Sequence, residues 1–116
     1  MNKINKEKII KQTETAVVLE FSIPGSSDYF NGHFPGFPVL PAVAQIFIIT
    51  HFVSRYFGIC IELSKIKRTK FINIIQPDIP LVLYLEKIEK NISFKIISTD
   101  EKTVFSAGTL VLPEEL

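Results

Sequence analysis

Residues 29–56, YFNGHFPGFPVLPAVAQIFIITHFVSRY, combine a proline-rich segment with an almost entirely apolar one. From Pro41 to Tyr56 the composition predicts a helix, and Gly58 is a typical residue to end it. Pro41 suits the first helical position, where its missing N–H does no harm. Apolar residues point in nearly every direction around this helix, so we expect protein to surround it.

The segment before the helix, 29–41, holds prolines at a spacing of three residues: Pro35, Pro38 and Pro41. Proline fixes φ, removes a backbone donor and pushes the preceding residue towards extended geometry. We therefore expect a stiff, extended loop that is neither a helix nor a paired strand.

Alternating apolar residues predict strands on both sides of this region. The expected strands are Glu14–Ile23, then Glu62–Ile75, Leu81–Ile88, Ile92–Ser98 and Val104–Leu112. Short links at 89–91 and 99–102 suggest hairpins, and therefore an antiparallel sheet. The predicted fold class is α+β, with one curved sheet around one central helix. Such a half-shell leaves a free sheet edge and an apolar helix side, which a second copy could cover.

The composition predicts a single domain over 1–116, with 1–13 as a peripheral N-terminal segment. One cysteine, Cys60, allows no internal disulfide and no metal-ligand pair, which favours a reducing compartment. A net charge of +1 argues against a nucleic-acid binder. The apolar run 39–53 is interrupted and short for a membrane span, so we expect a cytoplasmic protein.

Three blocks of sequence resemble one known family. Segment 29–45 is similar to the signature of the hotdog-fold 3-hydroxyacyl-(acyl carrier protein) dehydratases of the FabZ/FabA type. Its Ala44-Gln45 pair resembles the aryl-polyene-type branch most. Residues 66–71 with Gln76-Pro77-Asp78, and residues 106–110, resemble two later blocks of the same family. The resemblance implies a hotdog fold and a lyase acting in fatty-acid or polyene biosynthesis.

Dehydrating a 3-hydroxyacyl thioester requires a base for the C2 proton, an acid for the departing hydroxyl and donors for the enolate-like oxygen. His33 is the candidate base, because an unperturbed imidazole is largely neutral at pH 7. The N–H groups of Ala42 and Val43 start the predicted helix and suit the oxyanion. Phe34 and Phe47 are the other expected substrate contacts, although a phenylalanine such as Phe34 is more often a core or dimer-interface residue. No metal or redox cofactor is implied.

The sequence departs from the family pattern at the position of the acid. Dehydratases of this family place Glu or Asp fourteen residues after the motif histidine, where this chain has Phe47. Ala42 replaces a glycine, and Ile79 replaces the usual glycine of a turn. His51 lies one helical turn after Phe47 and is a possible auxiliary acid, or else a polar core residue. Gln45 can only hydrogen-bond a substrate.

Several functions therefore remain open. The first is a dehydratase acting on a thioester of an acyl carrier protein or coenzyme A, as a homodimer or higher even oligomer. The second is a catalytically silent acyl-binding or carrier-docking module, or one subunit of a pair whose partner supplies the acid. The third is a thioesterase. The basic residues Lys65, Lys67, Arg68 and Lys70 form either a solvated strand face or a site for an acidic carrier protein.

Overall fold

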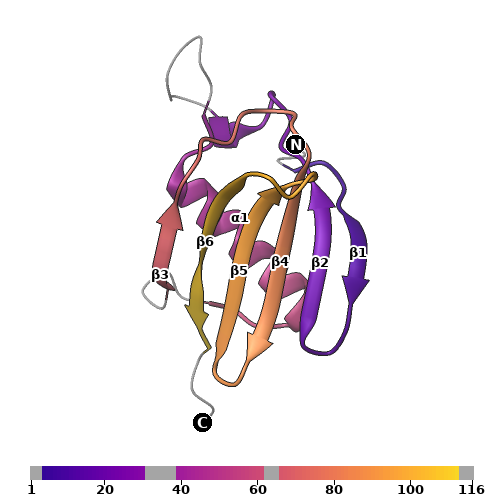
Figure 1. Cartoon of the computed structure of the whole chain (residues 1–116), viewed down its shortest axis with the longest axis vertical. Helices are drawn as coiled ribbons and strands as arrows, with labels where there is room; N and C mark the ends of the chain where they lie inside the picture. The colour runs from indigo at the N-terminus through magenta and orange to yellow at the C-terminus, as the bar shows by residue number, and fades with distance from the viewer. Residues whose placement is uncertain (1–3, 31–38, 62–65, 113–116) are drawn as a thin grey trace.

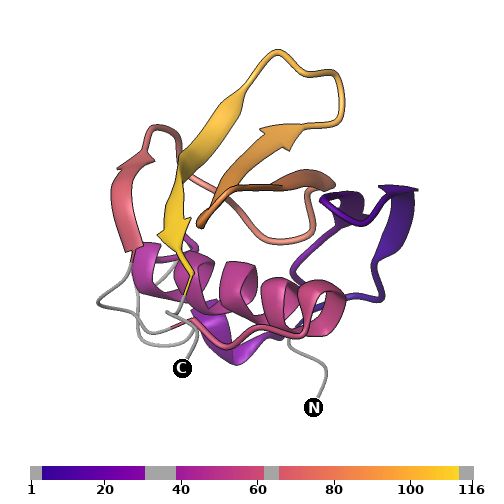
Figure 2. The same ribbon diagram turned by 90° about the horizontal axis from the view of Figure 1, so that it is seen from below.

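One curved antiparallel sheet wraps around one long helix (Figures 1 and 2). The computed structural model describes residues 4–30, 39–61 and 66–112. The elements are β1 (Lys8–Gln12), β2 (Ala16–Phe21), a 3-10 turn (Asp28–Phe30), α1 (Ala42–Phe57), β3 (Ile66–Phe71), β4 (Leu81–Ile88), β5 (Asn91–Ser98) and β6 (Val104–Val111). The strand order is β1-β2-β4-β5-β6-β3. The predicted architecture is confirmed.

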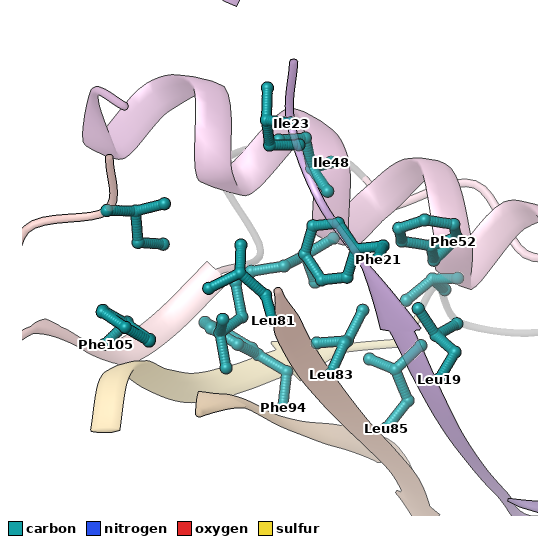
Figure 3. Close-up of a cluster of buried hydrophobic side chains, with 14 of the residues drawn as sticks. Leu19, Phe21, Ile23, Ile48, Phe52, Leu81, Leu83, Leu85, Phe94 and Phe105 are labelled. Carbon is teal, nitrogen blue, oxygen red and sulfur yellow. The ribbon is translucent and has the colours of Figure 1, made fainter. Parts of the chain in front are cut away.

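Alternation along the strands builds the core between the sheet and α1. In β2, Val17, Leu19 and Phe21 are buried, whereas the residues between them are only half-buried. The ring of Phe21 meets that of Phe52 on α1 edge to face, with their centroids 5.4 Å apart (Figure 3). Leucines from β4 and Phe94 from β5 lie on the same side of the sheet. Burial of these side chains is the main force that holds the helix to the sheet.

The helix itself lies within one residue of the prediction at each end. Pro41 is its N-cap rather than its first residue, and Gly58 ends it in the left-handed conformation with φ 68°. The N–H of Gly58 donates to the Ser54 carbonyl. One side of the helix packs on the sheet, while Val43 and Phe47 stay exposed. Within one chain the sheet therefore covers only part of the apolar helix surface, as expected of a half-shell.

Two strands differ from the prediction. Segment 1–13 contains β1, an edge strand that pairs with β2. Its exposed isoleucines, Ile9 and Ile10, are adjacent, so they give no alternation to detect. Within the described part of the expected strand 62–75, which starts at Ile66, β3 ends at Phe71. The N–H groups of Ile72 and Asn73 both donate to the single carbonyl of Phe105 instead of continuing a ladder.

The turn before β4 also differs in detail. The left-handed residue is Asp78, with φ 65°, and not Ile79 where the family pattern located the glycine. The N–H of Asp78 donates to the Ile23 carbonyl over 2.7 Å, and its carboxylate accepts from the N–H of Gly25 over 3.3 Å. An aspartate tolerates this conformation better than most residues, which explains how the turn forms without glycine.

A glycine lets β5, β6 and β3 pack closely. A methyl group added at Gly108 would lie 2.7 Å from the ring of Phe94 and 2.7 Å from the Thr69 hydroxyl. Phe94 is buried in the core, so its ring has little room to move away.

We expect Gly108→Ala to lower the free energy of unfolding by about 1–3 kcal/mol through overpacking. Gly25→Ala is the matched control, because a methyl group there meets only ordinary contacts at 3.4 Å or more. Urea unfolding of both variants measures the difference. Equal stability of the two variants would contradict this account of Gly108.

A polar cluster ties the chain before β1 to the end of α1. The Tyr56 hydroxyl donates to Glu7 over 2.6 Å, and Arg55 Nε lies 3.0 Å from the same carboxylate oxygen. Burial disfavours the charged carboxylate, but the Tyr56 hydrogen bond and the charges of Arg55 and His51 favour it. The net effect lowers the pKa of Glu7.

We expect Tyr56→Phe to cost about 1 kcal/mol at pH 7, because it removes a hydrogen bond to a carboxylate that is 11% exposed. Folding lowers the pKa of this carboxyl, so its charge stabilises the folded state at any pH above the pKa of the unfolded state, near 4.3. The stabilisation is lost as the pH falls from there through the pKa of the folded state. The difference from wild type should therefore shrink at pH 3 in urea unfolding.

Tyr84→Phe is the control, since Tyr84 donates 3.1 Å to the exposed Glu101. We expect it to change stability by less than about 0.5 kcal/mol. A loss with Tyr56→Phe that stays constant from pH 7 to pH 3 would show that the charge of Glu7 contributes nothing.

Candidate functional site

The N-terminus of α1 has no side-chain cap. Pro41 cannot supply one, and the first turn holds no acidic residue. The first helical hydrogen bond runs from the Gln45 N–H to the Pro41 carbonyl, so the N–H groups of Ala42 and Val43 have no partner within the helix. The helix dipole adds partial positive charge at this end. The arrangement suits an oxygen that carries or develops negative charge.

Neighbouring backbone fixes where this end points. The N–H of Leu40 donates to the Ile75 carbonyl over 2.9 Å, which links the approach to α1 with the segment after β3. The Gln45 amide nitrogen reaches back to the Leu40 carbonyl at 3.4 Å. Gln45 is 3% exposed, and its buried amide oxygen has no hydrogen-bond partner among the described residues. Its observed contact therefore supports the helix start.

A pocket of about 480 Å³ lies between the first turns of α1 and β3. Figure 2 shows this end of the helix beside β3. The described lining consists of three helix residues and three strand residues: Ala42, Val43, Ile46, Ile66, Thr69 and Phe71. All but Thr69 are apolar. The structure thus brings the predicted residues Ala42 and Val43 to a cavity with a mostly apolar lining. Such a lining is usual for a small-molecule site.

Exposed apolar residues occur on α1 and at the end of β3, and Val43 and Phe71 among them also line the pocket. We call this set the helix–β3 patch: Val43, Phe47, Phe71, Ile72 and Ile74. Phe47, predicted to replace the acid, is 47% exposed on the outer side of α1 and does not line the pocket within this chain. Large apolar side chains left exposed beside a pocket are candidates for contact with a protein or a ligand.

The candidate auxiliary acid, His51, is exposed and is not a polar core residue. Its ring packs edge to face on Phe52, with the centroids 5.2 Å apart. It follows Phe47 by one helical turn, and its charge is close enough to influence Glu7. His51 is thus exposed on α1, within electrostatic reach of Glu7, and is not among the described residues of the pocket.

Other predicted site residues fall outside the described residues, namely His33 and Phe34, as does Lys65 of the basic face. Lys67, Arg68 and Lys70 are exposed on or beside the outer face of β3. Across residues 4–30, 39–61 and 66–112, no group of three His, Cys, Asp or Glu side chains could hold a metal ion. The helix found in these ranges is not long and apolar enough to cross a membrane.

Thr69 is a pocket residue that the sequence analysis did not identify. It lies within the Lys-rich segment whose basic residues indicate either a solvated strand face or a site for an acidic carrier protein. The sequence nevertheless contains an indication of this placement. A glycine inside a strand, here Gly108, often marks a bulge or a close approach of another segment to the strand.

Comparisons with known proteins agree with this geometry. The family model of the ApeI-like dehydratases matches residues 9–109. The 3-hydroxyacyl-[acyl-carrier-protein] dehydratase FabZ of Levilactobacillus brevis is 33% identical over 93 residues, which cover 71% of this chain and 63% of that protein. The chain thus spans about three-fifths of the length of the curated relatives that it matches.

Two solved structures share nearly the whole fold. A chain of the dehydratase heterocomplex ApeI:P from Xenorhabdus doucetiae has a TM-score of 0.80 and 25% identity, over 98% of this chain and all of that one. An uncharacterized protein from Erwinia carotovora subsp. atroseptica has a TM-score of 0.72 and 28% identity, over 95% and 94%. With the family match over 9–109, these similarities show that the chain belongs to the ApeI-like dehydratase family and has its hotdog fold.

Proposed function

We propose that the protein binds a 3-hydroxyacyl thioester, carried on an acyl carrier protein or coenzyme A, and takes part in its dehydration. The observation that carries this proposal is the uncapped start of α1 at the edge of an apolar pocket. Free N–H groups beside an apolar cavity suit a thioester carbonyl whose acyl chain extends into that cavity.

In the proposed reaction, the Ala42 and Val43 N–H groups stabilise negative charge on the thioester oxygen. His33 removes the C2 proton, and the C3 hydroxyl leaves as water when it receives a proton. A double bond then joins C2 and C3. The role of His33 rests on the family resemblance of the segment that contains it.

The acid that protonates the leaving hydroxyl is the missing part of this scheme. Phe47 cannot transfer a proton, and a general acid commonly contributes about 10²–10⁴-fold in rate. His51 is the auxiliary candidate from this chain. Its exposure on the same side of α1 as Phe47 supports a site completed outside the single chain.

A second candidate is therefore a subunit whose partner supplies the acid. The exposed helix–β3 patch favours it, because a partner covering that patch would lie opposite Phe47. The similar chain from Xenorhabdus doucetiae belongs to a dehydratase heterocomplex. A catalytically silent carrier-docking module, which would use the basic residues Lys67, Arg68 and Lys70, and a thioesterase remain outcomes that an activity assay would reveal.

Phe47→Glu should raise dehydration of a short 3-hydroxyacyl thioester by about ten-fold or more, a part of what a well-placed acid supplies. The gain should be incomplete, because about 1 Å of misplacement can cost 10²-fold. Enoyl product and free thiol are measured together, which separates dehydration from thioester hydrolysis.

Phe47→Gln is the matched control, since it introduces polarity at the same position without an acid. Adding His33→Ala to Phe47→Glu should abolish the gain. If the wild type is active and loses activity with His51→Ala, while a folded Phe47→Glu gains nothing, the acid lies at His51. Release of free thiol without enoyl product would instead establish a thioesterase.

We also expect the protein to form a dimer or a higher even oligomer through the helix–β3 patch. Ile72→Glu should dissociate it at micromolar concentration in sedimentation velocity. Ile88→Glu is the matched control and should leave the oligomer intact. Ile88 is about as exposed as Ile72, at 52% against 55%, but it lies at the far end of β4. A monomeric wild type that assembles only with a second hotdog chain would favour the hetero-partner.

A further inference from the structure

A bulge in β3 holds Thr69, the polar residue among the described lining of the pocket. Between the pairs Lys67–Thr109 and Lys70–Ala107, strand β3 has two residues, Arg68 and Thr69, opposite one residue of β6. Arg68 adopts the left-handed conformation, with φ 53°. Such backbone is uncommon for a non-glycine residue, and bulges often redirect a side chain near a site.

The side of the sheet that Thr69 faces follows from its contacts. Its hydroxyl lies 2.7 Å from the point where a Gly108 methyl group would stand, beside the buried ring of Phe94. Gly108 pairs with Phe94, and paired residues share a face of the sheet, which here is the face towards α1. The absent side chain of Gly108 therefore leaves the space that the Thr69 hydroxyl occupies.

The hydrogen-bonding state of this hydroxyl is restricted. Thr69 Oγ1 donates to the Lys67 carbonyl over 3.3 Å. A hydroxyl has one donor hydrogen and two acceptor lone pairs, so in this arrangement it can only accept a further hydrogen bond. Among the described lining residues of the pocket it is the one polar side chain.

We infer that Thr69 is a specificity-determining residue, whose hydroxyl oxygen accepts a hydrogen bond from the 3-hydroxyl group of the bound acyl chain. This inference rests on the proposed function. An acceptor selects a chain that carries a donor, so Thr69 favours 3-hydroxyacyl over 3-oxoacyl and saturated acyl thioesters. A 3-oxo group would place two acceptors face to face, and a saturated chain would leave the oxygen without its partner.

The test compares binding of 3-hydroxybutyryl-CoA, acetoacetyl-CoA and butyryl-CoA by calorimetry, with product formation followed in parallel. Wild type should bind the hydroxy compound about three- to ten-fold more tightly than the other two, the range of one neutral hydrogen bond. Thr69→Val should bind all three alike, whereas Thr69→Ser should keep the preference.

Thr109→Val is the matched control, since Thr109 pairs with Lys67 on the opposite face of the sheet, and it should keep the preference. Thr69→Ala replaces Thr69→Val if the latter does not fold. Equal binding of the three thioesters by wild type, or a preference that survives Thr69→Val, would overturn the inference and leave acyl binding intact. Failure of wild type to bind any of them would overturn both the inference and the proposed function.

Discussion

A single curved sheet can cover only one side of a helix, and the rest of this structure follows from that constraint. The buried side of α1 provides a core with β2, β4 and β5 (Figure 3). The other side carries Val43 and Phe47 into solvent, and Val43 lines the pocket together with Phe71 of β3. The pocket opens at the border between the two sides. Fold, candidate assembly surface and candidate site are thus three results of the same geometry.

Much of this fold could be predicted from the sequence, because its strongest patterns coincide with complete burial. Strand β2 alternates cleanly, and β4 and α1 have nearly the predicted bounds. Prediction failed where side chains carry no pattern. Both isoleucines of β1 are exposed, so the strand is held by backbone pairing and by the polar contacts of Glu7 rather than by apolar burial. The end of β3 is decided by carbonyl sharing at Phe105, which no periodicity reveals.

The candidate site was predicted in part for similar reasons. Ala42 and Val43 were identified because a proline before an apolar helix specifies where free N–H groups occur. Thr69 was missed because its orientation depends on a bulge, and thus on Arg68 and Gly108 together. The significance of Phe47 came from the family pattern, whereas its exposure could be learned only from the structure. Residue chemistry is local in sequence, but pocket walls are assembled from distant segments.

The position of β3 in the sheet also affects how the pocket moves. Within the described sheet β3 is an edge strand held by β6 alone, and a bulge interrupts that pairing. An edge strand with few backbone hydrogen bonds to its neighbour needs less free energy for local unfolding than central strands such as β4 and β5. One wall of the pocket can therefore separate while the core and α1 stay folded. The cavity thus joins a rigid wall, which holds the backbone N–H groups of the helix start, to a compliant one, so the space between them can widen without global unfolding.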